Sequence, residues 1–242
     1  MPINKAKGNM YNFVSHTHNH LAGACPHQCT YCAIQDMARR FPVLRERYSG
    51  PIRVVEKEFN VKYDEKILRR DGGTYPGTIF MENCSDLFAE GVSPYQIHSI
   101  LSHCRDWPEN TYVFQTKNPG RVGPILAFFP PKFMIGTTAE CNRYSPMLSY
   151  APTPPERLEA MRAIEILRER KFVTVEPIVE FDHDIFLDML LASGAGTVNI
   201  GADSKKHGLP EPTGREIDLL VGDLRQAGIT VRLKPNLKRL IK

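Results

Sequence analysis

The sequence has little that would indicate a membrane or secreted protein. Its 242 residues include no apolar run of the roughly 18–20 residues that a membrane-spanning helix needs. The first segment, MPINKAKGNMYNF, contains no apolar stretch of the kind that a signal peptide requires. We therefore expect a cytoplasmic protein with no membrane contact and with reduced thiols. In that compartment its six cysteines are better suited to metal binding or catalysis than to disulfides.

The sequence also lacks internal repeats, low-complexity tracts and any linker that would separate two domains. Hydrophobic residues make up 42% of it and charged residues 24%, as in ordinary globular proteins. We expect a single domain over residues 1–242 with an insertion at about 42–76, where the segment 50–73 breaks the rhythm of the pattern. The insertion is predicted to form a hairpin or an extended excursion over the rest of the fold.

The chain has no strong overall charge, because 31 basic residues face 27 acidic ones. The excess of basic residues lies at the C-terminal end, and without that end the rest of the chain has one more acidic than basic residue. The basic residues at that end are Arg232, Lys234, Lys238, Arg239 and Lys242. They could contact phosphate or form a solvated tail, and the pattern leaves both readings open.

Short apolar runs alternate with amphipathic segments that begin with capping residues. The runs are mostly continuous rather than alternating, which is typical of parallel strands buried on both faces. They predict strands at Tyr11–Ser15, Thr78–Glu82, Thr111–Thr116, Phe133–Thr138, Phe172–Glu176, Thr197–Gly201 and Ile229–Lys234. Capping boxes at Ser93, Thr153 and Thr213 predict helices, the second carrying Leu158, Met161, Ile164 and Leu167 on its apolar face and the third ending near Gly228. A fourth helix is predicted from Asp182 to just before Gly194.

The β-α-β-α order predicts an α/β fold with a parallel sheet, either a full or partial (β/α) barrel or an open doubly wound sheet. In both architectures the chemistry lies at the carboxyl ends of the strands. The segment HLAGACPHQCTYCAIQ follows the first predicted strand and is therefore expected at that end.

This segment places Cys25, Cys29 and Cys32 within eight positions, in the spacing Cys-x3-Cys-x2-Cys. Structural zinc sites need four ligands, so a histidine would have to complete one. His16, His18, His20 and His27 are the nearby choices. An iron–sulfur cubane held by three thiolates keeps one iron open, and that vacancy is a place for a ligand.

The segment Cys25-Pro-His-Gln-Cys29-Thr-Tyr-Cys32 resembles the signature of the radical S-adenosylmethionine (SAM) superfamily, including the aromatic residue before the third cysteine. Segments after five later strands resemble an uncharacterised, phage-associated branch: CSDLF (84–88), QTKNP (115–119), GTTAE (136–140), VEP (175–177) and GADS (201–204). A more distant similarity is to spore photoproduct lyase. The resemblance implies a partial (β/α)6-type TIM barrel, the radical SAM core, over nearly the whole chain.

The resemblance implies that Cys25, Cys29 and Cys32 ligate a 4Fe–4S cluster, whose fourth iron binds SAM. It implies that Tyr31 contacts the adenine region of SAM. The superfamily often holds the SAM amino group with a Gly-Gly-Glu stretch after the second strand, and this chain has no such stretch. Glu82, Asn83 and Ser85 are the candidates there, while Thr138 and Glu140 are candidates for the ribose and carboxylate, and Glu176 is a further polar group at the same end.

Two further residues are candidates for catalysis. Cys141 follows the fourth strand and is a candidate hydrogen-atom donor, as a cysteine is in spore photoproduct lyase, with a plain packed thiol as the alternative. Lys117 follows the third strand and could hold a phosphate or carboxylate of the substrate.

The chain is thus predicted to be an oxygen-sensitive radical SAM enzyme. In that superfamily, reductive cleavage of SAM yields a 5′-deoxyadenosyl radical that abstracts hydrogen from a substrate. The substrate is expected to be nucleic acid, with a nucleotide or small metabolite as the second choice. A flavodoxin- or ferredoxin-type electron donor is an expected partner, and nucleic acid or a protein is expected to cap the barrel. The alternative is a zinc-binding Cys3His module that binds nucleic acid or protein.

Overall fold

The chain forms two compact units. The computed structural model describes residues 3–64, 66–68, 74–143 and 148–241. The first unit comprises Met1–Pro26, Ile34–Gln115 and Pro124–Met134, and the second comprises His27–Ala33, Thr116–Gly123 and Ile135–Lys242. Units of this kind are defined by local packing and do not test whether the chain folds as one domain, so the single domain stays a prediction.

The sheet of the first unit is mainly parallel. Strand β2 (His16–His18) pairs with β7 (Thr78–Met81), and β7 pairs with β8 (Thr111–Thr116), both in parallel, while β1 (Asn4–Lys5) is antiparallel to β2. Helix α3 (Pro94–Arg105) connects β7 to β8. It begins as predicted, because Ser93 accepts the Gln96 backbone N–H and Gln96 in turn caps Ser93.

The predicted insertion contains short elements of its own. Helix α2 follows α1 closely, β4 pairs antiparallel with β3, and a 3-10 helix comes next. Within it, β5 and β6 form an antiparallel pair. The bounds are α1 Ala33–Arg40, α2 Pro42–Arg47, β3 Leu21–Ala22, β4 Arg53–Val54, the 3-10 helix Glu56–Asn60, β5 Ile67–Leu68 and β6 Thr74–Tyr75. Residues 65 and 69–73, which belong to this predicted segment, lie outside the described residues.

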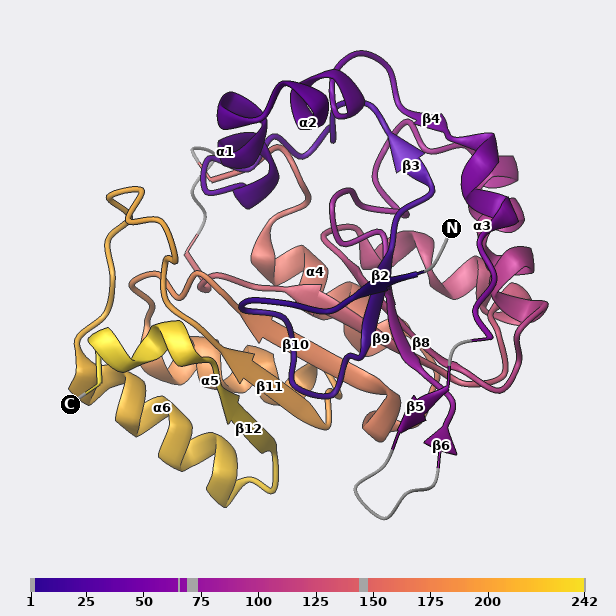
Figure 1. The fold of residues 1–242 in the computed structure, drawn as a ribbon. Coiled ribbons are helices and arrows are strands. Elements are labelled where there is room, and N and C mark those ends of the chain that lie inside the picture. Colours follow the sequence, from indigo (N-terminus) through magenta and orange to yellow (C-terminus); the bar gives the residue numbers. More distant parts are fainter. Residues whose placement is uncertain (1–2, 65, 69–73, 144–147, 242) are drawn as a thin grey trace. The chain divides into compact units, whose positions relative to one another are not determined.

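The second unit is built of parallel strands joined by helices (Figure 1). Its strands pair in the order of the chain, β9 with β10, β10 with β11 and β11 with β12. The bounds are β9 Phe133–Thr138, α4 Pro154–Ala163, β10 Lys171–Val175, α5 His183–Ala192, β11 Thr197–Ile200, α6 Gly214–Gln226 and β12 Thr230–Leu233. Capping boxes at Thr153 and Thr213 begin α4 and α6, as predicted.

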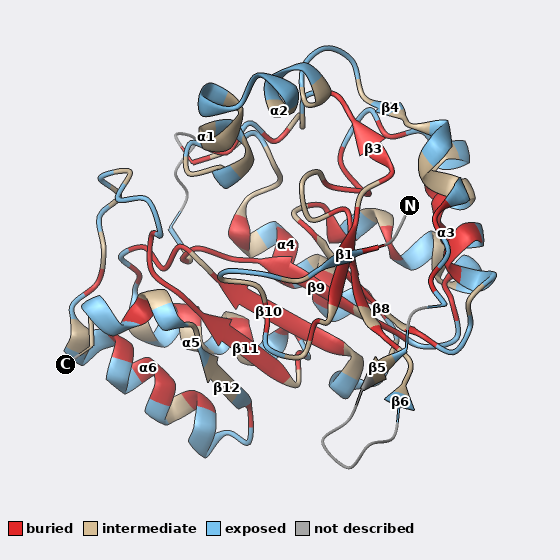
Figure 2. Ribbon diagram, in the orientation of Figure 1, coloured by how far each residue is buried: buried red, intermediate tan, exposed pale blue. Residues whose placement is uncertain are grey.

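The apolar core of the second unit lies on the helix-covered face of its sheet. Val173 and Val175 of β10 and Val198 and Ile200 of β11 belong to one buried cluster with apolar residues of α5 and α6. Figure 2 shows these strands buried and the outer side of α6 exposed. Because side chains alternate along a strand, the residues between these valines and isoleucines point to the opposite face.

The first predicted strand is misplaced. Tyr11–Ser15 is not a strand: the Val14 N–H donates to the Tyr11 carbonyl at 3.0 Å, and the strand begins only at His16. The apolar pattern was misleading because the true strand, His-Thr-His, is polar yet fully buried. The other predicted strands agree with the structure to within one residue at each end.

The predicted apolar face of α4 is partly wrong. The helix ends at Ala163, so Ile164 is its C-cap and Leu167, whose side chain is 67% exposed, lies beyond it. By contrast, α6 ends at Gln226 with Ala227 as its C-cap, followed by Gly228 with a φ of 77°, as expected of a glycine just after a helix. Among the described helices, none is long and apolar enough to cross a membrane.

Candidate functional site

All six cysteines are free thiols, and the three of the motif differ in burial. Cys25 lies in the first unit and is partly exposed, whereas Cys29 and Cys32 lie in the second unit, where Cys29 is buried and Cys32 partly exposed. The Cys32 N–H donates to the Cys29 carbonyl at 3.1 Å, so these two cysteines flank one tight turn. Among the described residues, no group of three His, Cys, Asp or Glu side chains is arranged to hold a metal ion.

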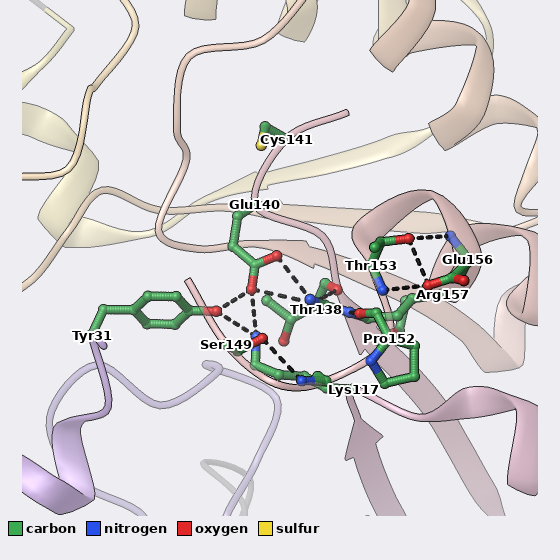
Figure 3. Close-up of polar contacts among 12 residues, drawn as sticks. Tyr31, Lys117, Thr138, Glu140, Cys141, Ser149, Pro152, Thr153, Glu156 and Arg157 are labelled. Atoms are coloured by element: carbon green, nitrogen blue, oxygen red, sulfur yellow. Dashed lines mark hydrogen bonds and ion pairs between the residues drawn. The ribbon is translucent and has the colours of Figure 1, made fainter. Parts of the chain in front are cut away.

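Next to this turn, Tyr31, Lys117 and Glu140 form a buried polar cluster (Figure 3). The Tyr31 hydroxyl donates to the Glu140 carboxylate, and Lys117 Nζ lies 2.5 Å from both the hydroxyl oxygen and Glu140 Oε1. Lys117 Nζ is also 5.0 Å from the centre of the Tyr31 ring. Tyr31 lies in the cysteine loop, Lys117 follows β8 and Glu140 follows β9. The structure therefore brings together three site residues that the sequence proposed separately.

Arg157 completes the cluster from α4. Its guanidinium lies 3.0 Å from Glu140 Oε2 and donates to the backbone carbonyls of Thr138 at 2.7 Å and Pro152 at 2.5 Å. Burial alone would raise the pKa of Glu140, but the charges of Lys117 and Arg157 and hydrogen bonds from Lys117 and Tyr31 hold it well below its ordinary value. With Lys117 protonated, the cluster carries two positive charges and one negative charge, and therefore an excess of one positive charge.

This charge acts on the Cys29 thiol. Burial raises the pKa of Cys29 above its ordinary value, and Glu140 and Cys32 add to this effect. Lys117 and Arg157 oppose it, because a cation favours the thiolate. Three thiols from one short loop, with two cations near the buried one, have the donor chemistry that an iron–sulfur cluster with three thiolate ligands requires. The three thiols are therefore the right type and number of donors for such a group, although the described residues do not gather them around one metal position.

The face of the second unit's sheet opposite its helices carries a row of polar side chains. Thr174 of β10 is in register with Thr138 of β9 and Asn199 of β11, and Asn199 is in register with Arg232 of β12. Asn199 is 1% exposed, and its Nδ2 has no hydrogen-bond partner among the described residues. A buried amide without an acceptor is costly, so this donor is available to a bound ligand.

Glu176 lies at the end of the same face, beyond β10. Lys234 Nζ lies 2.5 Å and Asn236 Nδ2 lies 2.7 Å from its carboxylate oxygens. Gly201 makes room for it, because a Cβ there would lie 2.7 Å from Glu176 Oε1. Glu176 is thus a neutralised carboxylate that also orders the segments after β11 and β12.

In the first unit, Glu82 holds the backbone that leads to Cys25. Its carboxylate is buried and accepts the N–H groups of His20 at 2.6 Å and Leu21 at 3.0 Å. Glu82 itself has a φ of 56°, a left-handed conformation that is uncommon for a residue with a side chain. This conformation places the carboxylate against the chain segment four residues before Cys25.

Glu82 also begins a chain of buried imidazoles. His20 Nδ1 lies 3.0 Å from Glu82 Oε1, His20 Nε2 lies 2.8 Å from His103 Nδ1, and His103 Nε2 lies 3.0 Å from the Val61 carbonyl. The two imidazoles thus form one continuous path of polar contacts from the Glu82 carboxylate to the Val61 carbonyl.

The other two candidates beyond β7 lie in the loop that follows. Asn83 Oδ1 accepts from Asn19 Nδ2 at 2.8 Å, and Asn19 Oδ1 accepts the Cys84 N–H at 2.8 Å. Ser85 Oγ is buried without a hydrogen-bond partner among the described residues. Of these groups, the Ser85 hydroxyl is the one with hydrogen-bonding capacity to spare.

Cys141 is a buried thiol at the edge of the core of the second unit. It is 1% exposed and belongs to the apolar cluster under α5 and α6. Its Sγ lies 3.2 Å from the Arg143 carbonyl, and burial raises its pKa to about 11. Cys141 is therefore a protonated thiol at neutral pH.

Sequence analysis missed Arg157, Asn199 and the pair of His20 and His103 as a unit. Arg157 is an arginine inside an amphipathic helix, and such residues are mostly solvated, so only its 2% exposure marks it as unusual. Asn199 could have been found, because an asparagine inside an apolar strand has to bond to something. His103 lies 83 positions from its partner, and nothing in the sequence joins them.

Residues 9–207, more than half of the chain, match a protein family described as "Protein of unknown function (DUF5131)". The chain belongs to this family. Among curated proteins, none matches it.

The fold of this DUF5131 chain is similar to that of spore photoproduct lyase, a radical SAM enzyme. A mutant of that enzyme has a TM-score of 0.63 at 14% identity, over 93% of this chain and 78% of the enzyme. A second mutant also has a TM-score of 0.63 at 14% identity, over 95% and 80%. A mutant with bound AdoMet and dinucleoside spore photoproduct has a TM-score of 0.57 at 15% identity, over 91% and 65%.

At this identity the likeness establishes the fold. The chain is an α/β protein with a parallel sheet, similar to the TIM-barrel-like fold of spore photoproduct lyase, and the predicted fold class is confirmed. The phage-associated branch stays a prediction, as do the roles of the individual site residues.

Proposed function

We propose that this DUF5131 protein is a radical SAM enzyme. The observation that carries the proposal is the Cys-x3-Cys-x2-Cys loop with free thiols, in a chain whose fold matches a radical SAM enzyme. Beside Cys29, the charges of Lys117 and Arg157 partly offset the rise in pKa that burial causes.

In this proposal Cys25, Cys29 and Cys32 hold a 4Fe–4S cluster that leaves one iron open to SAM. The chemistry that such a cluster supplies is reductive cleavage of SAM to methionine and a 5′-deoxyadenosyl radical, which takes a hydrogen atom from the substrate. The residues of the chain bind and orient SAM and the substrate, and they exclude water and oxygen. Glu82 contributes by fixing the backbone before Cys25, since both of its oxygens accept hydrogen bonds from it.

SAM carries a carboxylate, an ammonium group and a ribose diol, and the polar groups of the second unit suit these. The excess positive charge at Lys117, Glu140 and Arg157 suits the carboxylate. Thr138 and Glu176 are candidates for the ribose, and Tyr31 for the adenine region. The spare hydroxyl of Ser85 and the amide of Asn83 are the candidates for the ammonium group.

For the substrate we propose nucleic acid or a nucleotide. A structural neighbour binds a dinucleoside spore photoproduct, which supports this class. The basic residues on and after β12 support it as well, although Arg239 already pairs with Glu211 and Lys234 with Glu176. Lys242, the last of these residues, lies outside the described residues.

Cys141 is proposed as a hydrogen-atom donor. Such a donor must keep its S–H bond at neutral pH, and the raised pKa of Cys141 ensures this. A Cys141→Ala protein that gives the same product at the same yield would remove this role.

Anaerobic reconstitution tests the proposed function. We expect about four iron per chain, broad visible absorbance and release of 5′-deoxyadenosine when SAM and dithionite are added. Cys32→Ala should lose the iron and the colour. Cys104→Ala removes a fully buried thiol outside the motif and should keep both. A colourless protein with one zinc per chain would instead support the Cys3His alternative.

Binding of single-stranded DNA at increasing salt tests the substrate class. Phosphate contacts require that affinity falls steeply as salt rises, with a slope of about 0.7 per contact for single strands. If protein that has its cluster and cleaves SAM binds neither oligonucleotides nor nucleotides, the substrate should be sought among small metabolites.

A further inference from the structure

Helices α1 and α2 are more exposed than the other α-helices of the described residues, each of which buries at least two side chains. All their residues are described, and neither helix buries a single side chain. Phe41 between them is 54% exposed and Val43 of α2 is 75% exposed. Figure 2 shows both helices without any buried part. Helices of a globular protein normally bury one apolar face, so this pair is available to a partner.

Arginines surround these apolar side chains. Arg39, Arg40 and Arg45 are exposed, and with Phe41 and Val43 we call them the α1–α2 patch. Arg39 lies 3.3 Å from Asp36, whereas neither Arg40 nor Arg45 has an ion pair among the described residues. The patch therefore presents unneutralised positive charge around an apolar centre, which is the composition of a protein interface for an acidic partner.

The patch is anchored beside the cysteine motif at both of its ends. Helix α1 begins at Ala33, directly after Cys32. At the other end, the Arg47 carbonyl of α2 accepts the Gly23 N–H at 2.8 Å, and the Gly50 carbonyl accepts the Ala24 N–H at 2.9 Å. Gly23 and Ala24 are the two residues directly before Cys25. No side chain fits at Gly23, because a Cβ would lie 2.2 Å from the Pro51 carbonyl oxygen.

The anchor is rigid rather than a loose tether. The Arg47 guanidinium lies 2.9 Å from Glu58 Oε1 and donates to the Asn19 carbonyl at 2.8 Å. One side chain thus fixes the end of α2 to two other segments of the first unit. A partner that binds the patch consequently binds a surface whose position next to Cys25 is fixed.

We propose that the α1–α2 patch is the docking surface for an acidic electron-transfer protein of the flavodoxin or ferredoxin type. This inference rests on the proposed function. One electron leaves the reduced cofactor of the donor, which is oxidised by one electron, and passes to the cluster; no proton or group is transferred. The surface suits this role because it adjoins the cysteine loop at both ends.

A protein partner is favoured over nucleic acid by the most exposed apolar side chain of the patch. Val43 is aliphatic and 75% exposed, so it suits packing in a protein interface but offers no face on which a base can stack. Phe41 suits either partner, and Asp36 and Glu46 disfavour both alike.

The test measures binding of purified oxidised flavodoxin to the anaerobically purified protein by titration calorimetry, with the variants R40E/R45E and Val43→Asp. We expect each to weaken binding about tenfold or more, and the affinity of the parent protein to fall with salt. The matched control, R215E/R225E, makes the same charge change at exposed positions of α6 and should change the affinity less than about twofold.

Equal affinities of the patch variants and the control would overturn the docking surface, as would a parent protein that binds neither flavodoxin nor a ferredoxin. Loss of single-stranded DNA binding in R40E/R45E without loss of flavodoxin binding would also overturn it, in favour of a nucleic-acid surface.

Dithionite separates this proposal from the proposed function, because it reduces a cluster without docking. R40E/R45E should release 5′-deoxyadenosine with dithionite at the parental rate but lose release driven by flavodoxin. If the parent itself releases none with dithionite, the proposed function fails whatever the binding result.

Discussion

At the scale of single residues, the buried charge of Glu140 is maintained by cationic partners that surround it. Glu140 is 0% exposed and touches Lys117, Arg157 and Tyr31. Removal of one member of such a buried group leaves the others uncompensated, which is far more destabilising than the group itself is stabilising. These residues should therefore be sensitive even to nearly isosteric substitutions.

Glu140→Gln tests this directly. It keeps the shape of the side chain but leaves Lys117 and Arg157 buried without a counter-charge, so we expect the free energy of unfolding to fall by about 3–5 kcal/mol. Urea denaturation measures the change. Glu159→Gln on α4 is the control, because that side chain is 69% exposed and should change stability by less than about 1 kcal/mol.

Glu82→Gln tests the other buried carboxylate. An amide nitrogen cannot accept an N–H group, so the backbone N–H of either His20 or Leu21 loses its acceptor. We expect the free energy of unfolding to fall by about 1–3 kcal/mol, the cost of leaving a buried donor unsatisfied. Urea denaturation measures the change, and unchanged stability would contradict this role of Glu82.

Two buried histidines make stability depend on pH. Burial, with repulsion from neighbouring charges, lowers the pKa of His18 to about 3 and that of His103 to about 4. The unfolded chain takes up protons near pH 6.5 and the folded one does not, so this stability is fully present above pH 6.5 and is lost as pH falls toward the folded values. The titratable and charged groups facing these rings include His20, Arg47, Glu58 and Asp106, and the two rings also face each other.

Between pH 6.5 and 5 we expect the free energy of unfolding to fall by up to about 1.4 kcal/mol per pH unit for each of these histidines. His103→Gln should flatten the dependence, and His98→Gln, on the exposed side of α3, should leave it unchanged. Stability that is constant over this range in the parent protein would show that these rings are not held neutral.

At the scale of elements, local signals in the sequence are strong where a helix begins and weak where a strand is polar. The three capping boxes are satisfied by atoms within four residues of one another, so they act before any tertiary contact forms. Strand β2 has no such local signal, since His16, Thr17 and His18 become buried only by contact with distant segments.

The cap of α6 gives an element-scale prediction. Thr213 Oγ1 accepts the Glu216 N–H and donates to the Glu216 carboxylate. Thr213→Ala should reduce the free energy of unfolding by about 1 kcal/mol, which chemical denaturation can resolve. Because the cap lies outside the polar cluster around Glu140, iron content and colour should stay unchanged.

At the scale of the whole molecule, the proposed cofactors should stabilise the folded chain. A ligand that binds only the folded protein adds about 2.7 kcal/mol when present at about a hundred times its dissociation constant. We expect SAM to raise the unfolding temperature of the reconstituted protein and to have no effect on Cys32→Ala. A rise of the same size in Cys32→Ala would mean that SAM binds without the cluster.

The sequence by itself determined the cysteine motif, the helix starts and the alternation of strands and helices, and from these the α/β fold class. All of these features depend on residues that are close together in the chain. Only the tertiary structure decided that Arg157 joins Lys117 and Glu140, that Asn199 keeps a donor unused, and that the rings of His20 and His103 meet. Each of these depends on residues far apart in the sequence, which packing of the folded chain brings within a few ångströms of each other.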